Sequence, residues 1–379
     1  MLDNIWLASA VWIGLALASS LISIRLALSV ALVEIMVGAL GGNLIGLPLT
    51  PWVNYLAGFG AILLTFLAGA EVDSDVVRRN LGSTMSIGVM GFVAPYLGCM
   101  LIARYLLGWG WPQSQIAGIA LSTTSVAVVY AVMVETGLNK TELGKIILAA
   151  CFINDLGTVL ALGVVFANFS IWLAAFAIVT LAVVFALPSV APRFFKMVGS
   201  RVSEPEIKFL LLILFALGGF ASAVGSEAVL PAYLVGMALA PAFKLQPEVS
   251  HRMRVIAFAV LTPFYFLKAG SLVEAGVLVS AAGLILLFLG VKMATKFIGI
   301  LPLTRYYRFE AREGMYTTLL MSTGLTFGTI SALYGYTNQI IDQQQYTILV
   351  VGVIGSAVVP TLIAQKWFLP KIEPAKQEV

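Results

Sequence analysis

The sequence predicts an all-α polytopic membrane protein with about thirteen transmembrane helices. Of its 379 residues, 60% are hydrophobic and only 11% are charged. Apolar runs repeatedly reach about 18 to 25 residues, which is the length that a helix needs to cross a bilayer. A soluble domain carries about a quarter charged residues, so this chain has too few polar side chains to cover a soluble surface.

Charged residues and clusters of glycine and proline divide the chain into the predicted spans. These are residues 5–23, 27–46, 54–70, 83–106, 114–134, 146–168, 170–190, 208–225, 228–242, 254–273, 276–301, 314–335 and 345–367. The first span lacks a basic segment before it and a small-residue cleavage site after it. It is therefore expected to be a span rather than a removed signal peptide.

The distribution of lysine and arginine predicts the orientation of these spans. When alternate loops are assigned to one side, 18 of the 22 basic residues gather there: Arg25, Arg78, Arg79, Lys140, Lys145, Arg193, Lys196, Arg201, Lys208, Lys244, Arg252, Arg254, Arg305, Arg308, Arg312, Lys366, Lys371 and Lys376. The opposite side receives only Arg104, and Lys268, Lys292 and Lys296 fall within spans. Because basic residues concentrate in cytoplasmic loops, the N-terminus is expected outside and the C-terminus in the cytoplasm.

The chain is expected to form a single membrane domain over residues 1–379. The longest basic loop, 193–208, lies near the midpoint and has the charge, serine and proline content of a linker between two halves. The tail after Pro370 is too short for a soluble regulatory domain.

The residue types present disfavour several other classes of function. Cys99 and Cys151 lie in different spans and lack the spacing of a metal site. The sequence contains no nucleophile–base pair and no phosphate-binding loop, so neither an enzyme nor a bound cofactor is expected. Its basic residues follow the topology of the chain, so they do not predict a nucleic-acid partner.

Two clusters of serine and threonine interrupt the apolar spans at corresponding places near the ends of the two halves. The first lies at 122–125 within ALSTTSVAVVY, and the second lies at 322–323 within LLMSTGLTFGTIS. Corresponding interruptions indicate a transporter built from inverted repeats, whose broken helices meet at mid-membrane. The alternative is that these hydroxyls only bond to their own helices or join neighbouring ones.

Asp155 lies beside Asn154 in the middle of an apolar span, in the segment FINDLGT. A carboxylate at this depth is costly to ionise, so its charged form needs a proton, a cation or a basic partner. These are the states that a cation exchanger requires. The alternative is a protonated or salt-bridged Asp155 that only fixes helix packing, and Asn154 is either an ion ligand or a cap for the broken helix.

Lys292 and Lys296 lie one helical turn apart on the same face of the span at 276–301. Either lysine could pair with Asp155 when the ion site is empty. For Lys296, the alternative is that its stem reaches the cytoplasmic interface. Lys268 is expected to reach the outer interface or to pair with Glu274.

Six short segments, found in the order typical of the family, resemble bacterial monovalent cation:proton antiporters, and the resemblance spans almost the whole chain. This group holds the Na+/H+ exchangers and the Kef-type potassium effluxers. The segments are VALVEIMVGALGGN (30–43), GAILLTFLAGAEVD (60–73), STTSVAVV (122–129), FINDLGT (152–158), TPFYFLKAG (262–270) and ATKFIGILPLTR (294–305).

The resemblance implies an inverted-repeat antiporter fold with two crossed discontinuous helices, in a homodimer in the bacterial inner membrane. A core of residues 83–168 and 276–367 would move as an elevator against a scaffold of the remaining helices. The resemblance also implies that Asp155 binds the proton or the cation. Thr123, Thr124 and Ser125 would surround this site, and Lys296 would be favoured over Lys292 as the competing partner.

The sequence departs from the electrogenic members of this group, which carry two adjacent acids where this chain has Asn154 and Asp155. One titrating carboxylate returns one charge per cycle, so electroneutral exchange of one cation for one proton is expected. Na+ is favoured as the transported cation, with Li+ also possible. A Kef-type K+/H+ antiporter is the alternative, followed by a sodium-coupled solute symporter and a potassium channel.

Overall fold

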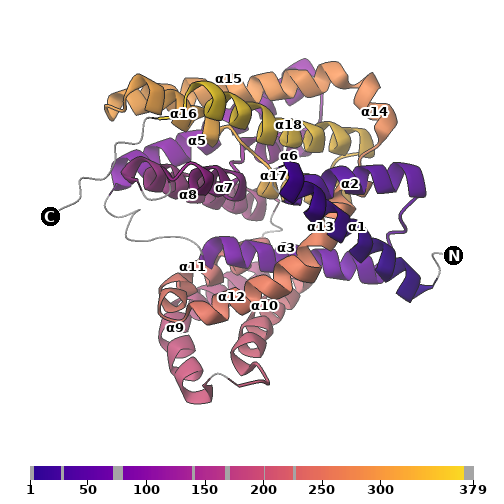
Figure 1. The fold of residues 1–379 in the computed structure, drawn as a ribbon, viewed down its shortest axis with the longest axis vertical. Helices are drawn as coiled ribbons and strands as arrows, with labels where there is room; N and C mark the ends of the chain where they lie inside the picture. Colours follow the sequence, from indigo (N-terminus) through magenta and orange to yellow (C-terminus); the bar gives the residue numbers. More distant parts are fainter. Residues whose placement is uncertain are drawn as a thin grey trace. The chain divides into compact units, whose positions relative to one another are not determined.

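A computed structural model describes residues 4–26, 30–70, 80–138, 141–166, 171–199, 201–224 and 228–370. These residues form helices and connecting segments and include no strand, which confirms the predicted all-α class (Figure 1). The chain divides into two compact units, each built from two segments. Unit one comprises Met1–Asp73 and Val159–Ala275, and unit two comprises Ser74–Thr158 and Gly276–Val379.

Unit one is a bundle of long apolar helices. Its helices are α1 (Ile5–Leu26), α2 (Val30–Ile45), α3 (Pro51–Ala70), α9 (Ile171–Val198), α10 (Pro205–Ala223), α11 (Val229–Leu245) and the continuous run of α12 (Pro247–Ile256), the π-helical turn η3 (Ala257–Leu261) and α13 (Thr262–Ser271). Helices α2 and α13 approach so closely that Gly38 lies on the backbone of Leu267 and Gly270 lies on the backbone of Ile35. Small residues allow this contact between helix backbones, which is a typical packing mode in membranes.

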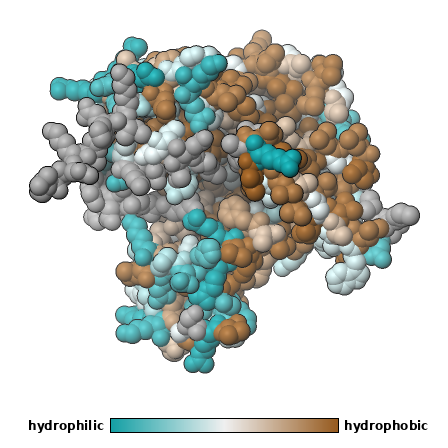
Figure 2. All heavy atoms as spheres, in the orientation of Figure 1, coloured by the Kyte–Doolittle hydropathy of each residue, from teal (hydrophilic) through white to brown (hydrophobic). Residues whose placement is uncertain are grey.

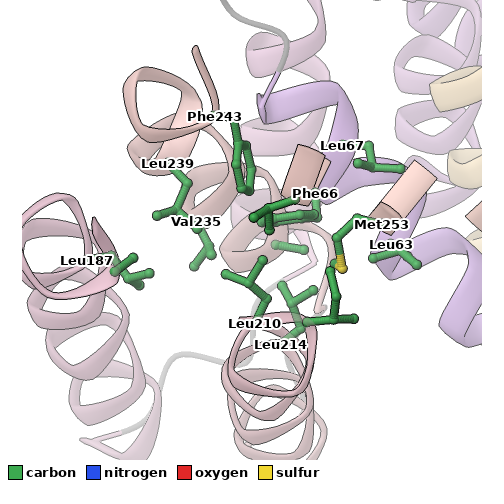
Figure 3. Packing of buried hydrophobic residues seen from close by; sticks show 14 of the residues in the cluster. Leu63, Phe66, Leu67, Leu187, Leu210, Leu214, Val235, Leu239, Phe243 and Met253 are labelled. Atoms are coloured by element: carbon green, nitrogen blue, oxygen red, sulfur yellow. The ribbon is translucent and has the colours of Figure 1, made fainter. Parts of the chain in front are cut away.

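The interior of unit one is filled by aliphatic and aromatic side chains (Figure 3). They come from α11 and from four helices that pack against it: Phe66 on α3, Leu187 on α9, Leu210 on α10 and Met253 on α12. Because lipid is as apolar as these side chains, the bundle is held together by their close van der Waals packing and not by exclusion from water.

Unit two contains both of the interrupted segments. Its helices are α5 (Leu81–Leu101) with the π-helical turn η1 (Ile102–Leu106), α6 (Trp111–Ser122), α7 (Val126–Glu135), the part of α8 (Glu142–Val165) up to Thr158, α14 (Ala275–Ser280), α15 (Ala282–Tyr306), α16 (Ala311–Met321), α17 (Thr326–Thr337) and α18 (Gln343–Trp367). Helix α15 packs against α5, α16 and α18, and α6 packs against α5 and α17.

The outer surface of α15 and α18 carries large apolar side chains. Leu286 and Ile298 on α15 are 67% and 73% exposed, and Leu362 on α18 is exposed as well. Figure 2 shows this hydrophobic surface in brown over the part of unit two that α15 forms in Figure 1. Contiguous apolar surface of this kind is expected where a helix faces lipid.

Nine of the described helices are long and apolar enough to cross a bilayer, and α2 and α11 are shorter apolar helices. A helical membrane protein with several spans is therefore confirmed. The count of thirteen spans and the orientation of the termini stay predictions. Five basic residues used for the orientation fall outside the described residues: Arg78, Arg79, Lys140, Lys371 and Lys376. Residues 71–73, the end of the segment 60–73, also fall outside them.

The predicted linker at 193–208 is mostly helical. Helix α9 continues to Val198 and α10 begins at Pro205. Proline is favoured in the first helical turn because the missing N–H has no helical partner there, so the Pro205 that suggested a loop instead begins a helix. This segment also lies within unit one, so it does not separate the two compact units.

Candidate functional site

Both serine–threonine clusters interrupt a helix in the structure. Helix α6 ends at Ser122 and α7 begins at Val126, and Thr123 between them has extended backbone angles of φ −63° and ψ 154°. Helix α16 ends at Met321 and α17 begins at Thr326. We call residues 123–125 the first break and residues 322–325 the second break.

The two breaks contact each other within unit two. The Thr124 hydroxyl donates to the Met321 carbonyl oxygen at 2.8 Å, and the Ser125 N–H donates to Thr323 Oγ1 at 3.4 Å. Main-chain groups at a helix end lack their helical partners, and here some of these groups are bonded across the two breaks. The crossing of the broken helices stays a prediction.

Asn154 on α8 closes the first break with both ends of its amide. Its Oδ1 accepts from the Thr124 N–H at 3.0 Å, and its Nδ2 donates to the Ser122 carbonyl oxygen at 3.3 Å. These two contacts are those of a cap for the broken helix, and the role of Asn154 as an ion ligand stays a prediction.

Asp155 is buried next to this cap, with 1% of its surface exposed. Its Oδ1 has no hydrogen-bond partner in the part of the chain that the structure describes. Buried polar atoms almost always have a partner, and an oxygen without one is costly. Asp155 therefore carries an unused acceptor that a proton or a cation would satisfy.

The two predicted lysines are completely buried, but they contact different groups. Lys296 Nζ donates to Thr124 Oγ1 at 3.0 Å in the first break. Its burial excludes a side chain that reaches the membrane interface. Lys292 Nζ donates instead to Ser356 Oγ on α18 at 2.8 Å. Lys268 belongs to α13 in unit one.

The side chains of Thr123 and Ser125 are buried beside Thr124 but bond within their own segment. Thr123 Oγ1 donates to the Ala120 carbonyl oxygen at 3.2 Å, and Ser125 Oγ accepts from the Val128 N–H at 3.4 Å. The second bond caps the start of α7, a role for which serine is favoured. Only Thr124 among the three bonds to Lys296.

The structure adds groups that the sequence did not assign to the site. These are the main-chain oxygens of Ser122 and Met321, the Ser356 hydroxyl and the backbone of Gly324. A main-chain oxygen has no sequence signal other than the break itself. Ser356 had one available signal, since it is a hydroxyl within the apolar run VVGVIGSAVVP.

Comparison with known proteins identifies the family. The family model described as "Sodium/hydrogen exchanger, transmembrane" matches residues 12–368. The "Probable Na(+)/H(+) antiporter 3" of Methanocaldococcus jannaschii is 26% identical over 347 residues, which cover 88% of each chain. The "Na(+)/H(+)-K(+) antiporter GerN" of Bacillus cereus is 23% identical over 347 residues, again covering 88% of each chain.

A solved structure agrees in fold. The sodium proton antiporter MjNhaP1 from Methanocaldococcus jannaschii, determined at pH 8, matches with a TM-score of 0.73 and 15% identity, covering 96% of this chain and 100% of that one. The match to the family model spans nearly the whole chain, including both breaks and Asp155. The protein belongs to the sodium/hydrogen exchanger family.

Proposed function

We propose that this protein is a secondary active Na+/H+ antiporter in which Asp155 binds H+ and Na+ in turn. The observation that carries the proposal is the buried Asp155 Oδ1 without a partner, beside a helix break held by Asn154 and Lys296. A family of sodium/hydrogen exchangers supplies the class of reaction. The buried carboxylate supplies a group that both transported ions could share.

The proposed cycle depends on competition at one carboxylate. A deprotonated Asp155 accepts Na+ on one side of the membrane, with oxygens of the Thr123–Ser125 break as further ligands. A proton that binds Asp155 on the other side removes the negative charge that holds Na+, so the cation leaves. Lys296 acts as the competing partner of the carboxylate while the site is empty.

We propose an electroneutral stoichiometry of one Na+ for one H+. Asn154 is a neutral amide whose donor and acceptor are both engaged by the first break, so it adds no titrating charge. Asp155 then carries one proton in one direction or one cation in the other. Lys296 keeps its own proton in this scheme, whether it is bonded to Thr124 or paired with Asp155, so it does not contribute a second proton.

We also propose that unit two carries the site as an elevator, in a homodimer in the bacterial inner membrane. All of the predicted site residues belong to unit two, which supports their moving as one body. Thirteen spans with the N-terminus outside are accommodated by the nine long helices, the shorter α2 and α11, and the two broken pairs α6–α7 and α16–α17.

K+/H+ exchange is the second candidate, because the name of the Bacillus cereus relative includes K+ as well as Na+. Purified protein in liposomes that enclose a pH-sensitive dye separates the candidates. Addition of Na+ or Li+ outside is expected to raise the internal pH, whereas K+ would do so only for the second candidate. An internal pH that responds to none of the three cations would overturn both.

A further inference from the structure

Lys292 makes a contact that the proposed ion cycle does not use. Its Nζ donates to Ser356 Oγ at 2.8 Å, and Ser356 Oγ in turn donates to the Val353 carbonyl oxygen at 2.7 Å. The single hydroxyl hydrogen of Ser356 is directed to Val353, so Ser356 accepts from Lys292 with a lone pair. The lysine thus joins α15 to α18 as a hydrogen-bond donor.

The same amine lies directly on the backbone of the second break. A methyl group at Gly324 would overlap Lys292 Nζ, and it would lie 2.9 Å from Thr123 Oγ1 and 3.1 Å from Ser356 Oγ. Glycine is required where another group approaches the backbone this closely. Lys292, Thr123 and Ser356 therefore converge on the space beside Gly324.

The second break is also in contact with the first break through the residues that flank Gly324. The Met321 carbonyl oxygen accepts from Thr124, and Thr323 Oγ1 accepts from the Ser125 N–H. A shift of the second break would move the Thr124 hydroxyl, to which Lys296 is bonded beside Asp155. Hydrogen bonds and one close approach, that of the Lys292 amine to Gly324, thus lead from Ser356 past the second break to Thr124 and Lys296.

We propose that Lys292 is a positioning residue that fastens the second break to α15 and α18 and thereby determines which monovalent cation the site accepts. Selectivity among such cations depends on how the oxygen ligands are spaced and how firmly they are held. This inference rests on the proposed cation exchange. It gives Lys292 a different role from Lys296, which contacts the first break.

The test compares Na+, Li+ and K+ as substrates of variants in proteoliposomes. Lys292→Met keeps the length of the side chain without its donor, Lys292→Gln keeps a donor, and Ser356→Ala removes the acceptor. The apparent constant for K+ is its KM or, where K+ is not transported, its inhibition constant against Na+-driven flux. In Lys292→Met and Ser356→Ala, the ratio of this K+ constant to the KM for Na+ (the KM ratio) is expected to fall roughly tenfold, the scale of one lost buried hydrogen bond. Lys292→Gln should recover part of the ratio.

Two matched controls separate this role from general damage. Lys268→Met makes the same exchange at a buried lysine of unit one, and Thr361→Ala removes an α18 hydroxyl that donates only to Ala357 in its own helix. Both controls should keep the wild-type KM ratio. Gly324→Ala, which would displace the amine, should lower the KM ratio as Lys292→Met does. When Gly324→Ala is combined with Lys292→Ala, the KM ratio should change by less than the product of the two single fold-changes.

A folded, active Lys292→Met protein with the wild-type KM ratio would overturn the inference. The inference would also be overturned if Lys292→Met and Lys292→Gln lost all transport and only Lys292→Arg restored it. That pattern would show that transport needs the positive charge of Lys292 and not its hydrogen bond. If Lys292→Met does not fold, a folded and active Ser356→Ala protein with the wild-type KM ratio would overturn the inference in its place. A wild-type protein without any cation-dependent proton flux would instead refute the proposed function itself.

Discussion

The Thr124 N–H donates to Oδ1 of Asn154 at 3.0 Å, so a side chain of α8 holds the backbone of the first break. An aspartate at position 154 would keep this acceptor and lose the donor to the Ser122 carbonyl oxygen. It would also add a second carboxylate beside Asp155. The effect of Asn154→Asp on structure and on stoichiometry can therefore be predicted separately.

Asn154→Asp is expected to make the exchange sensitive to membrane potential, because two carboxylates can return two protons for one cation. The wild-type rate should be independent of potential. The measurement is Na+-driven proton flux in proteoliposomes whose potential is clamped with valinomycin and K+ gradients. A wild-type rate that changes strongly with potential would contradict the electroneutral proposal, whatever the variant does.

Asp155→Asn is expected to abolish cation-dependent proton flux without unfolding the protein, because an amide of the same size cannot release a proton. Asp342→Asn is the matched control. Asp342 caps α18 by accepting from the Gln345 N–H, and asparagine caps helices equally well, so this variant should transport normally. Flux retained in Asp155→Asn would show that another group carries the proton.

Na+ is expected to raise the melting temperature of the wild-type protein but not that of Asp155→Asn. A ligand that binds only the folded state at 100 times its Kd adds about 2.7 kcal/mol of stability. Thermal unfolding in increasing NaCl, with choline chloride at equal ionic strength as the reference, measures this shift. Equal shifts in both proteins would place Na+ away from Asp155.

Thr124→Val is expected to weaken Na+ binding and to lower stability by about 1–3 kcal/mol, the cost of leaving buried polar groups without partners. The Thr124 hydroxyl accepts from Lys296 and donates to Met321, and valine has the same shape without the hydroxyl. Thr124→Ser, which keeps the hydroxyl, should keep most of the wild-type Na+ affinity and stability. The apparent KM for Na+ and the melting temperature provide the comparison, and a valine variant equal to wild type would remove Thr124 from the site.

Gly270→Ala is expected to destabilise unit one by about 1–3 kcal/mol or more, as overpacked cores do. A methyl group there would overlap the Ile35 carbonyl oxygen between α13 and α2. Gly58→Ala on α3 is the control, because the space around Gly58 is open. The expected result is a lower melting temperature in the first variant only, and equal melting curves would contradict the close contact of α2 with α13.

The sequence was sufficient to predict the helical membrane class and the positions of both breaks, because long apolar runs and their polar interruptions are local signals. The charges also identified Lys292 and Lys296, and the family resemblance favoured Lys296, which the structure places on the first break. Groups without a charge or a motif were missed: the Met321 carbonyl oxygen, the Ser356 hydroxyl and the backbone of Gly324. Their importance comes from helices far apart in the chain, which only the fold brings together.

The loop predicted at 193–208 is shorter in the structure for a related reason. Charge, serine and proline are typical of loops, but they are also tolerated in the exposed first and last turns of long helices. Pro205 and Lys196 lie in such turns of α10 and α9. Composition alone does not distinguish a loop from a helix that continues beyond the apolar core of the bilayer.

The two-ended amide of Asn154 limits how this transporter could evolve. A single codon change would give an aspartate and a second titrating group, but it would leave the Ser122 carbonyl oxygen without its donor. A lineage that changed its ion stoichiometry by this route would lose stability unless a compensating donor near the end of α6 had appeared first. The geometry of one hydrogen bond therefore makes the order of mutations matter.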